Sequence, residues 1–273
     1  MAVENPHVMF LSCSTLGGLR GNTTPQVFLV DQLRTLIRVK DAGYDCVEMY
    51  YRDVPEWVGS TVKEAVRDLQ LRPYSIHLPK FLFTYPESEF LKAVDSIFPF
   101  MRDLEVKVAV LHPPNEEQIL GEKTWEAWLQ DLLKRSEDAG VKLAFELVPY
   151  VRGVDAFILQ QIEKNKDRPL GITIDLEFMY FLGLDIERLT DTFRSRVVNI
   201  HFRDGDGTLT DAEGKRKYLL PGTGKIDLQR VVDVLKKANY GGPLTVEVSH
   251  RNRENIVRAR AFAENCLGLS PKT

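Results

Sequence analysis

Four residues of this 273-residue chain combine oxygen and nitrogen donors in a pattern that could hold a metal ion. Each lies within or directly after a short apolar run, and the set is Glu146, Asp175, His201 and Glu247. A charge in an apolar segment is costly to bury unless it is paired or bound to a cation. Three carboxylates and one imidazole suit one divalent ion, such as Mn²⁺, Mg²⁺, Co²⁺ or Zn²⁺. We therefore expect one divalent metal as a cofactor, held by these four side chains.

Ion pairing is the alternative explanation for the carboxylates. Arg203 follows His201 by two positions, and Lys225 lies further along the chain. Either cation could pair with a carboxylate and remove the need for a metal. Arg203 could equally bind an anionic group of a substrate, or pair with Glu247 or Asp204.

Three further residues are candidate substrate contacts. His77 and His112 each follow an apolar run. They could bind substrate hydroxyls, hold a second metal or polarise a carbonyl, or they could be hydrogen-bonded structural residues. Glu48 lies in another run and could form a polar wall of the pocket or pair with Arg20. Together with Arg203, these residues form the predicted substrate-binding set.

The elements that must position these residues alternate between two types. Short apolar and β-branched runs indicate strands at 8–13, 44–50, 73–78, 107–111, 142–147, 171–174, 197–202 and 244–248. Runs with helical spacing lie between and after them, at 25–43, 58–69, 87–104, 123–139, 154–165, 186–194, 227–238 and 254–266. Thr24 is the expected cap of the first helix, Asp227 caps the seventh, and Gly241 lies just past its end.

Strict alternation of strand and helix implies parallel strands, and eight such units in this length predict a (β/α)8 TIM barrel of the α/β class. We expect one domain over residues 1–273. An open doubly wound sheet is the alternative, but residues 14–18, Ser-Thr-Leu-Gly-Gly, lack its G-x-G-x-x-G fingerprint. The carboxyl ends of barrel strands face one pocket, so the candidate residues are expected to meet there.

Composition argues against several classes of protein. The chain has 36 basic and 39 acidic residues, a formal charge of −3, which disfavours a nucleic-acid partner. No apolar run approaches the roughly 20 residues of a membrane helix, and residues 1–7 do not resemble a signal peptide. Cys13, Cys46 and Cys266 lack the spacing of a metal ribbon or disulfide framework, so we expect reduced thiols and a cytoplasmic location.

On these features the chain resembles the xylose-isomerase-like barrels, in particular the group of sugar phosphate isomerases and epimerases, from about residue 8 to 267. The resemblance rests on the order and spacing of Phe145-Glu146, Ile174-Asp175, the run 199–204, the run 221–227 and the run 245–248. In that family the Glu, Asp, His and Glu of strands five to eight hold one divalent metal, which implies this role for the four residues above. Members include inosose isomerases and dehydratases, ketose 3-epimerases and hydroxypyruvate isomerases, and homo-oligomers occur among them.

The sequence departs from two members of this family, which narrows the activities that the resemblance implies. Endonuclease IV shares the barrel and uses three zinc ions, and His77 and His112 match positions that hold one of its extra metals. The histidine expected three residues after the strand-six Asp is Phe178 here, and the expected Asp-x-His pair is absent from 204–225. The third metal therefore lacks ligands, which disfavours a nuclease. Ketose 3-epimerases also carry that histidine, which helps bind the sugar, so Phe178 disfavours a 3-epimerase substrate.

The resemblance implies an isomerase or epimerase of a small sugar, ketose or polyol ketone. A metal would stabilise the enediolate formed when a C–H beside a carbonyl is deprotonated, and Glu146 and Glu247 would move the proton. A dehydratase of an inosose-like substrate is the main alternative, because the same enediolate could expel a β-hydroxyl. A sugar-binding barrel without catalysis is another. Gly222-Thr223-Gly224 could cradle a phosphate, although a glycine turn leading to Asp227 is favoured.

Overall fold

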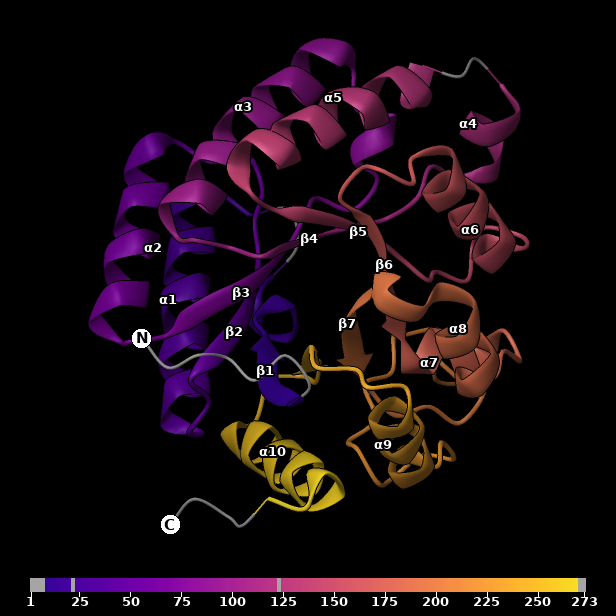
Figure 1. Cartoon of the computed structure of the whole chain (residues 1–273). Helices are drawn as coiled ribbons and strands as arrows, with labels where there is room; N and C mark the ends of the chain where they lie inside the picture. The colour runs from indigo at the N-terminus through magenta and orange to yellow at the C-terminus, as the bar shows by residue number, and fades with distance from the viewer. Residues whose placement is uncertain (1–7, 21–22, 122–123, 270–273) are drawn as a thin grey trace.

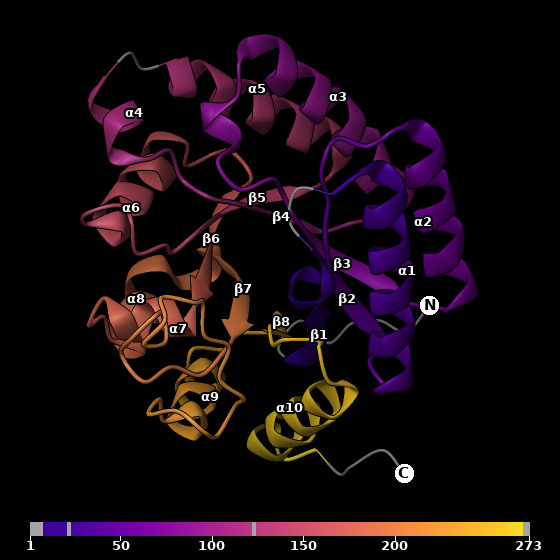
Figure 2. The same cartoon turned by 180° about the vertical axis from the view of Figure 1, so that it is seen from behind.

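Eight parallel strands close into a barrel in the computed structural model, which describes residues 8–20, 23–121 and 124–269. Each strand pairs with the next along the chain, and β8 pairs with β1, so the sheet has no free edge (Figure 1, and Figure 2 from behind). The strands are β1 (Phe10–Ser14), β2 (Cys46–Tyr50), β3 (Arg72–His77), β4 (Val108–Leu111), β5 (Lys142–Glu146), β6 (Leu170–Asp175), β7 (Val197–Phe202) and β8 (Pro243–Val246). The predicted TIM barrel is confirmed, and each strand overlaps its expected segment.

Helices surround the barrel on its outside (Figure 1). The eight expected from the sequence are α1 (Pro25–Asp41), α2 (Glu56–Asp68), α3 (Glu87–Asp103), α5 (Thr124–Ala139), α6 (Val154–Lys164), α8 (Ile186–Phe193), α9 (Leu228–Lys237) and α10 (Arg253–Leu267). Within the described residues, two short helices were not expected, α4 (Glu116–Leu120) after β4 and α7 (Leu176–Phe181) after β6. Three 3-10 turns are η1 (Leu16–Gly18), η2 (Leu82–Thr84) and η3 (Arg194–Arg196). Lys123, the expected start of the fourth helix, and residues 1–7 lie outside the described residues.

Helix α9 illustrates how the sequence specifies the outer layer. The Asp227 carboxylate accepts a hydrogen bond from the backbone N–H of Arg230 at 2.9 Å, which confirms the predicted cap. One apolar face packs inward, comprising Leu228, Val231, Val232, Val234 and Leu235. The helix ends at Lys237, and the left-handed residue that follows is Asn239, with φ 55°. Gly241 lies past the end of the helix, as expected, and the left-handed position falls two residues earlier, where asparagine also tolerates this conformation.

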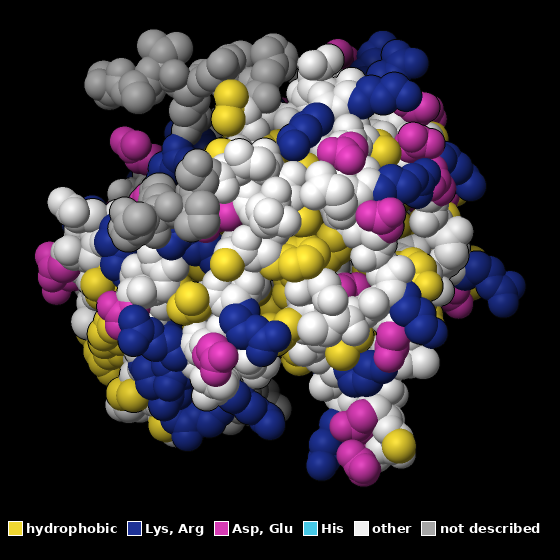
Figure 3. Space-filling model, turned by 90° about the horizontal axis from the view of Figure 1, so that it is seen from below, with side chains coloured by type: hydrophobic (Ala, Val, Ile, Leu, Met, Phe, Trp, Pro, Cys, Tyr) yellow, Lys and Arg dark blue, Asp and Glu magenta, His cyan; other side chains and the backbone are white. Residues whose placement is uncertain are grey.

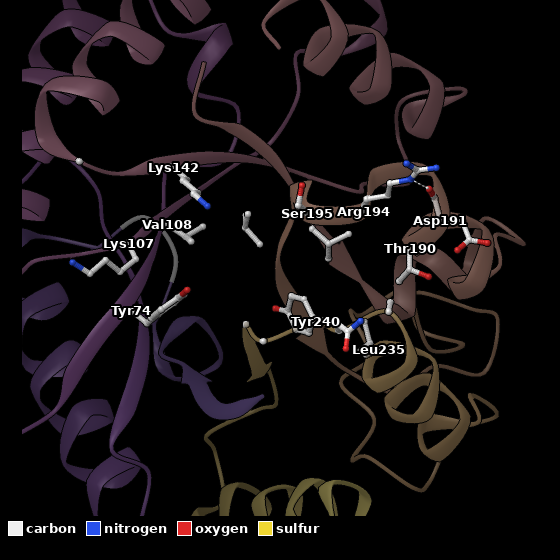
Figure 4. Close-up of a pocket in the computed structure, with 17 residues that line it drawn as sticks. Tyr74, Lys107, Val108, Lys142, Thr190, Asp191, Arg194, Ser195, Leu235 and Tyr240 are labelled. Carbon is white, nitrogen blue, oxygen red and sulfur yellow. Dashed lines mark hydrogen bonds between the residues drawn. The ribbon is translucent and has the colours of Figure 1, made fainter. Parts of the chain in front are cut away.

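The two ends of the barrel are distinct. At the amino ends of the strands, a hollow of about 700 Å³ is lined in part by Tyr74, Lys107, Lys142 and Arg194 (Figure 4). None of the candidate site residues lines this hollow. The candidate residues instead follow the carboxyl ends of the strands, where the connections to the helices begin. The barrel therefore separates this hollow from the end that carries the candidate chemistry.

Two expectations from composition were reduced cysteines and the absence of a membrane helix. Cys13, Cys46 and Cys266 are free thiols, and all three are buried. Burial, with the nearby carboxylates of Glu48 and Glu247, raises the pKa of the Cys13 thiol well above its usual range, so this sulfur stays protonated. Among the helices of the described residues, none combines the length and apolar character needed to cross a membrane.

Candidate metal centre

Consecutive strands bring the four predicted metal ligands together. Glu146 ends β5, Asp175 ends β6, His201 lies near the end of β7, and Glu247 directly follows β8. The Cα atoms of Asp175 and His201 are register partners, which places both side chains at one level of the barrel. The Nδ1 atom of His201 lies 2.9 Å from Glu146 Oε1, 3.7 Å from Asp175 Oδ2 and 3.7 Å from Glu247 Oε2. One imidazole nitrogen thus faces one oxygen of each carboxylate, and the exposed fraction of every side chain is 3% or less.

A buried network beneath this centre holds the other side of the His201 ring. The Nε2 atom of His201 lies 3.2 and 3.3 Å from the two carboxylate oxygens of Glu48. The same Glu48 carboxylate accepts hydrogen bonds from Ser75 Oγ at 2.8 Å and Asn199 Nδ2 at 3.0 Å. Thr245 Oγ1 in turn donates to Asn199 Oδ1 at 2.8 Å. The Nε2–H of His201 is therefore directed at Glu48, which leaves Nδ1 facing the three carboxylates, where a cation could replace its proton.

The sequence left two roles open for Glu48, a polar wall of the pocket or a pair with Arg20. Its side chain is fully buried, and its oxygens contact protein groups rather than an open pocket. The alternative partner, Arg20, is also elsewhere, because its guanidinium pairs with Asp31 at 2.8 Å. The expected polar wall at Glu48 therefore has no exposed carboxylate surface with which to meet a substrate.

The two candidate substrate-binding histidines, His77 and His112, both contact the Oε2 atom of Glu146. Glu146 Oε2 lies 2.7 Å from His112 Nε2 and 3.2 Å from His77 Nε2. His77 Nδ1 lies 2.8 Å from the carbonyl oxygen of Leu78 and donates to it, while Nε2 faces Glu146. His112 Nδ1 contacts the Tyr150 hydroxyl at 2.6 Å. His77, His112 and Glu146 thus form a second group of donors that could bind a substrate hydroxyl or a cation.

Arg203 bridges the carboxylates on the other side of the centre. Its Nη1 atom lies 3.0 Å from Asp175 Oδ2 and 3.2 Å from Glu247 Oε1, and its Nη2 atom lies 2.5 Å from Glu177 Oε2. Only 5% of the Arg203 side chain is exposed. The ion pair with Glu247 that the sequence left open is therefore present, whereas the one with Asp204 is not.

Three residues of this region were not anticipated from the sequence as parts of the site, namely Glu177, Arg216 and Tyr218. Glu177, in α7, is buried and pairs with Arg216 as well as Arg203. The aromatic rings of Phe178 and Tyr218 lie 5.3 and 5.2 Å from the Arg203 guanidinium carbon. The only sequence signal was the position of Glu177, two residues after Asp175. Arg216 and Tyr218 belong to the long connection after β7, whose path back to the site has no periodic pattern.

The electrostatics of the site fit a bound cation. Five buried carboxylates face two guanidinium groups, which leaves three negative charges when the histidines are neutral. These carboxylates are Glu48, Glu146, Asp175, Glu177 and Glu247. Burial lowers the pKa of His201, but Glu48 and Glu146 outweigh this and hold it well above its usual value. A divalent cation among oxygen and imidazole donors would offset the surplus that Arg203 and Arg216 leave.

The glycine turn after β7 is occupied by a side chain of the protein itself. The buried Asp204 carboxylate accepts backbone hydrogen bonds from Gly205, Gly222, Gly224 and Ile226, at 2.8, 2.9, 2.8 and 3.2 Å. These N–H groups are the ones that a phosphate would need. The turn is therefore the favoured structural one that leads to α9, and its backbone N–H groups are not available for phosphate.

Comparison with known proteins assigns the chain to a family. The sequence profile of the xylose isomerase-like TIM barrel family matches residues 36–266, so the chain belongs to this family. An inosose isomerase of Halalkalibacterium halodurans is 23% identical over 228 residues, covering 76% of this chain and 78% of that protein. An inosose dehydratase of Clostridium perfringens is 22% identical over 263 residues, covering 83% and 86%.

Solved structures share the same fold. An L-ribulose 3-epimerase superposes with a TM-score of 0.72 at 18% identity, covering 96% of this chain and 95% of that one. A 3-keto-D-glucoside 4-epimerase from E. coli superposes with a TM-score of 0.69 at 15% identity, covering 95% and 98%. The expected family and fold are thus confirmed, and the relatives and neighbours are named as sugar isomerases, epimerases or dehydratases.

Proposed function

We propose that the protein is a divalent-metal-dependent isomerase or epimerase of a small sugar, ketose or polyol ketone. The observation that carries this proposal is the approach of His201 Nδ1 to Glu146, Asp175 and Glu247 at 2.9 to 3.7 Å. The names of the relatives, inosose isomerase and inosose dehydratase, support a polyol ketone as the substrate class. We expect no nucleic-acid partner and no membrane partner. A homo-oligomer is compatible with this proposal.

The proposed ligands are Glu146, Asp175, His201 and Glu247. When bound, a divalent cation supplies positive charge that stabilises negative charge developing on a substrate oxygen. Arg203 keeps Asp175 and Glu247 in place, because one Nη1 atom contacts both carboxylates. Phe178 and Tyr218 shield this guanidinium from water on its faces. The chain thus provides a largely pre-formed donor set rather than one assembled on binding.

Proton transfer in this proposal belongs to Glu146 and Glu247. Burial raises the pKa of Glu146, but His201 and His112 outweigh it and hold the pKa well below its usual value. Burial likewise raises the pKa of Glu247, and Arg203 and His201 outweigh it, so its pKa is lowered. Both groups are ionised at neutral pH, and either can remove a proton from the carbon beside a carbonyl. In an isomerisation, the carboxyl group that took the proton returns it to the neighbouring carbon. In an epimerisation, the second carboxylate first takes a proton from water and delivers it to the opposite face, and the first group releases its proton to water.

A dehydratase is the second candidate, favoured by the Clostridium perfringens relatives of that name. It would begin with the same proton removal, followed by loss of a hydroxyl from the neighbouring carbon as water. The two reactions differ in mass, because isomerisation conserves the mass of the substrate and dehydration removes one water. Mass spectrometry of the product therefore separates them.

The test combines metal analysis with turnover. The purified protein is analysed for divalent metals and is incubated in D₂O with a panel of inososes and ketoses. We expect one divalent metal per chain, and either solvent deuterium in an isomeric product or loss of water. Glu247→Gln is expected to abolish turnover, while Glu264→Gln, which alters a carboxylate paired with Arg260 on α10, leaves it intact.

Four results would count against this proposal. Turnover that survives metal removal contradicts the metal dependence. Full activity of Glu247→Gln contradicts the two-carboxylate transfer. Cleavage of abasic DNA with two or three metals per chain identifies an endonuclease IV-like phosphodiesterase instead, and binding of sugars without any turnover identifies a non-catalytic barrel. A second metal that is lost in His77→Ala, while the first is retained, would assign His77 and His112 to a cation rather than to substrate hydroxyls.

A further inference from the structure

A second, strongly basic cleft lies outside the candidate metal centre. It has a volume of about 530 Å³ and opens between the connection after β1 and the connection after β8. Four of its eight lining residues are arginines, and the lining comprises Gly17, Gly18, Leu19, Arg20, Arg34, Arg38, His250 and Arg251. We call this feature the arginine cleft. Figure 3 views the molecule from the side of α10 and shows Lys and Arg side chains gathered on the left of that face.

Protein contacts hold three of the four arginines in place. Arg20 forms a two-pronged pair with Asp31, through Nε at 2.8 Å and Nη2 at 3.0 Å. Arg34 Nη2 contacts the same carboxylate at 2.6 Å, and the Asp31 side chain is only 1% exposed. Arg38 Nη1 donates to the carbonyl oxygen of His250 at 2.6 Å. These contacts fix the guanidinium groups and still leave most of their N–H donors free, because each guanidinium carries five.

Charge in the arginine cleft is far from balanced. Among the described residues, Asp31 is the one carboxylate that pairs with these arginines, and Arg251 has no ion pair. Four positive charges therefore face one negative charge, and like charges held close together repel. A surface whose positive groups are fixed in one place without matching anions attracts an anion from solution. Three positive charges therefore remain after Asp31 is counted, and one further carboxylate would not neutralise them.

Two glycines and a histidine form the rest of the cleft surface. A Cβ atom at Gly17 would lie 1.9 Å from the Val248 carbonyl oxygen, and one at Gly18 would lie 2.3 Å from Thr35 Oγ1. Only glycine fits these positions, because the backbone here packs directly against Val248 and Thr35. The backbone N–H of His250 donates to the Gly17 carbonyl at 3.0 Å and joins the two connections. Within the described residues, His250 Nδ1 is buried and has no hydrogen-bond partner.

We propose that the arginine cleft binds a phosphate group, carried either by the substrate itself or by a separate small molecule. A phosphate monoester carries close to two negative charges at neutral pH and three acceptor oxygens, which matches several forked guanidinium donors better than a single carboxylate does. The connections that form the cleft follow the carboxyl ends of β1 and β8, and His250 comes three residues after Glu247. These connections lie at the same end of the barrel as the metal centre, and α1 contributes Arg34 and Arg38 to the cleft. Phosphate binding to the cleft does not depend on the proposed metal chemistry, whereas its assignment to the substrate rests on the proposed function.

The first experiment measures binding of inorganic phosphate to metal-free protein by titration calorimetry at fixed ionic strength. We expect saturable binding of one phosphate per chain. Arg251→Gln should weaken it about tenfold, as expected for loss of one charged hydrogen-bond donor. The matched control is Arg258→Gln, which removes the same charge from an exposed position of α10 outside the cleft. Arg38→Gln is a second variant, and it should weaken phosphate binding in the same direction.

The outcomes of this titration are decisive for the cleft. Absence of saturable binding at millimolar phosphate overturns the proposal. Equal affinities of Arg251→Gln, Arg258→Gln and the native protein also overturn it, because the phosphate then binds elsewhere. Since the protein is metal-free, a failure here is distinct from a failure of the proposed isomerase activity.

A second experiment distinguishes the two sources of the phosphate. With metal-loaded protein, the KM values of a sugar and of its phosphate ester are compared in native protein and in Arg251→Gln. A rise in KM for the ester alone assigns the cleft to the substrate. Unchanged KM values, together with phosphate binding that raises the melting temperature of native protein but not of Arg251→Gln, assign it to a separate ligand. If neither effect is seen, the cleft does not bind phosphate under working conditions and the proposal is wrong.

Discussion

Replacing Glu48 by glutamine should weaken divalent-metal binding, although Glu48 is not itself one of the four proposed ligands. The Glu48 carboxylate receives three donors, His201 Nε2 at 3.2 and 3.3 Å, Ser75 Oγ at 2.8 Å and Asn199 Nδ2 at 3.0 Å. Glutamine keeps the shape but exchanges one oxygen for an NH₂ group, which is a donor. Three donors then compete for one remaining oxygen, and the charge that orients the His201 ring is lost.

The magnitude follows from the kind of contact that is removed. A hydrogen bond to a charged group contributes about 1.5 to 3 kcal/mol. Loss of a carboxylate that orients a metal-ligating histidine typically lowers metal affinity about 10- to 100-fold, which corresponds to about 1.4 to 2.7 kcal/mol. Both estimates agree, so we expect Glu48→Gln to bind Mn²⁺ or Zn²⁺ about 10- to 100-fold more weakly than the native protein.

Competition with a chelator of known affinity measures this effect, and urea unfolding of the metal-free proteins monitors stability. The matched control is Glu264→Gln, which removes a buried carboxylate 2.7 Å from Arg260 on α10. We expect both variants to lose stability, but only Glu48→Gln to lose metal affinity. Metal affinity within twofold of the native value in Glu48→Gln would refute the orienting role. A raised KM with unchanged metal affinity would instead restore Glu48 as part of the substrate pocket.

The charges around the site predict the response to metal and to pH. Mn²⁺ at a hundred times its Kd should stabilise the protein by about 2.7 kcal/mol, measured as an upward shift of the melting temperature that a chelator reverses. Because the pKa of His201 is raised in the folded state, the metal-free protein should lose stability as pH rises from about 6.5 through that raised pKa, as followed by urea unfolding at each pH. Metal affinity should rise over the same range, because a proton on His201 competes with the metal, and pH-independent affinity would contradict this. Asp204→Ala should destabilise the protein by about 3 kcal/mol, because it leaves buried N–H groups unpaired, whereas Asp206→Ala, at a surface pair with Lys217, should change the urea midpoint far less.

The barrel fold and the clustering of the four candidate ligands could be predicted from the sequence for one physical reason. In parallel strands that are all followed by helices, the carboxyl ends must lie on one side, whatever the details of packing. A charge at the end of each of four consecutive apolar runs therefore predicts a cluster. The structure places Glu146, Asp175 and His201 at those ends of their strands and Glu247 one residue beyond β8. The identity of a bound metal stays a prediction, since several divalent ions suit the same donors.

The depth of a side chain within the barrel was not accessible in this way. Glu48 lies in the middle of β2 and pairs in register with Ser75, below the level of the ligands. Its depth depends on the stagger between strands, which includes a register shift at Val47 and Glu48. Nothing in the local pattern distinguishes a carboxylate that orients a histidine from one that lines a pocket.

The path of the long connection after β7 also could not be predicted from the sequence. It contains isolated bridges, between Asp204 and Leu219 and between Thr210 and Arg216, instead of a regular element. Its path is set by long-range contacts, such as Asp204 with the glycine amides and Arg216 with Glu177. These contacts join residues that are 18 to 39 positions apart in the sequence. Sequence periodicity therefore carries no information about them.

Phe178 shows how this connection bears on substrate choice. Resemblance to the ketose 3-epimerases implies that a sugar-binding histidine stands at this position in those enzymes. Here the phenyl ring lies 5.3 Å from the Arg203 guanidinium carbon and 5.5 Å from that of Arg216. A ring that stacks on two cations offers no hydrogen bond to a sugar hydroxyl, but it fixes the arginine that bridges Asp175 and Glu247. The same position thus holds the arginine that bridges two of the proposed metal ligands. We expect a substrate to find its hydroxyl contacts elsewhere, with His77 and His112 as the candidates.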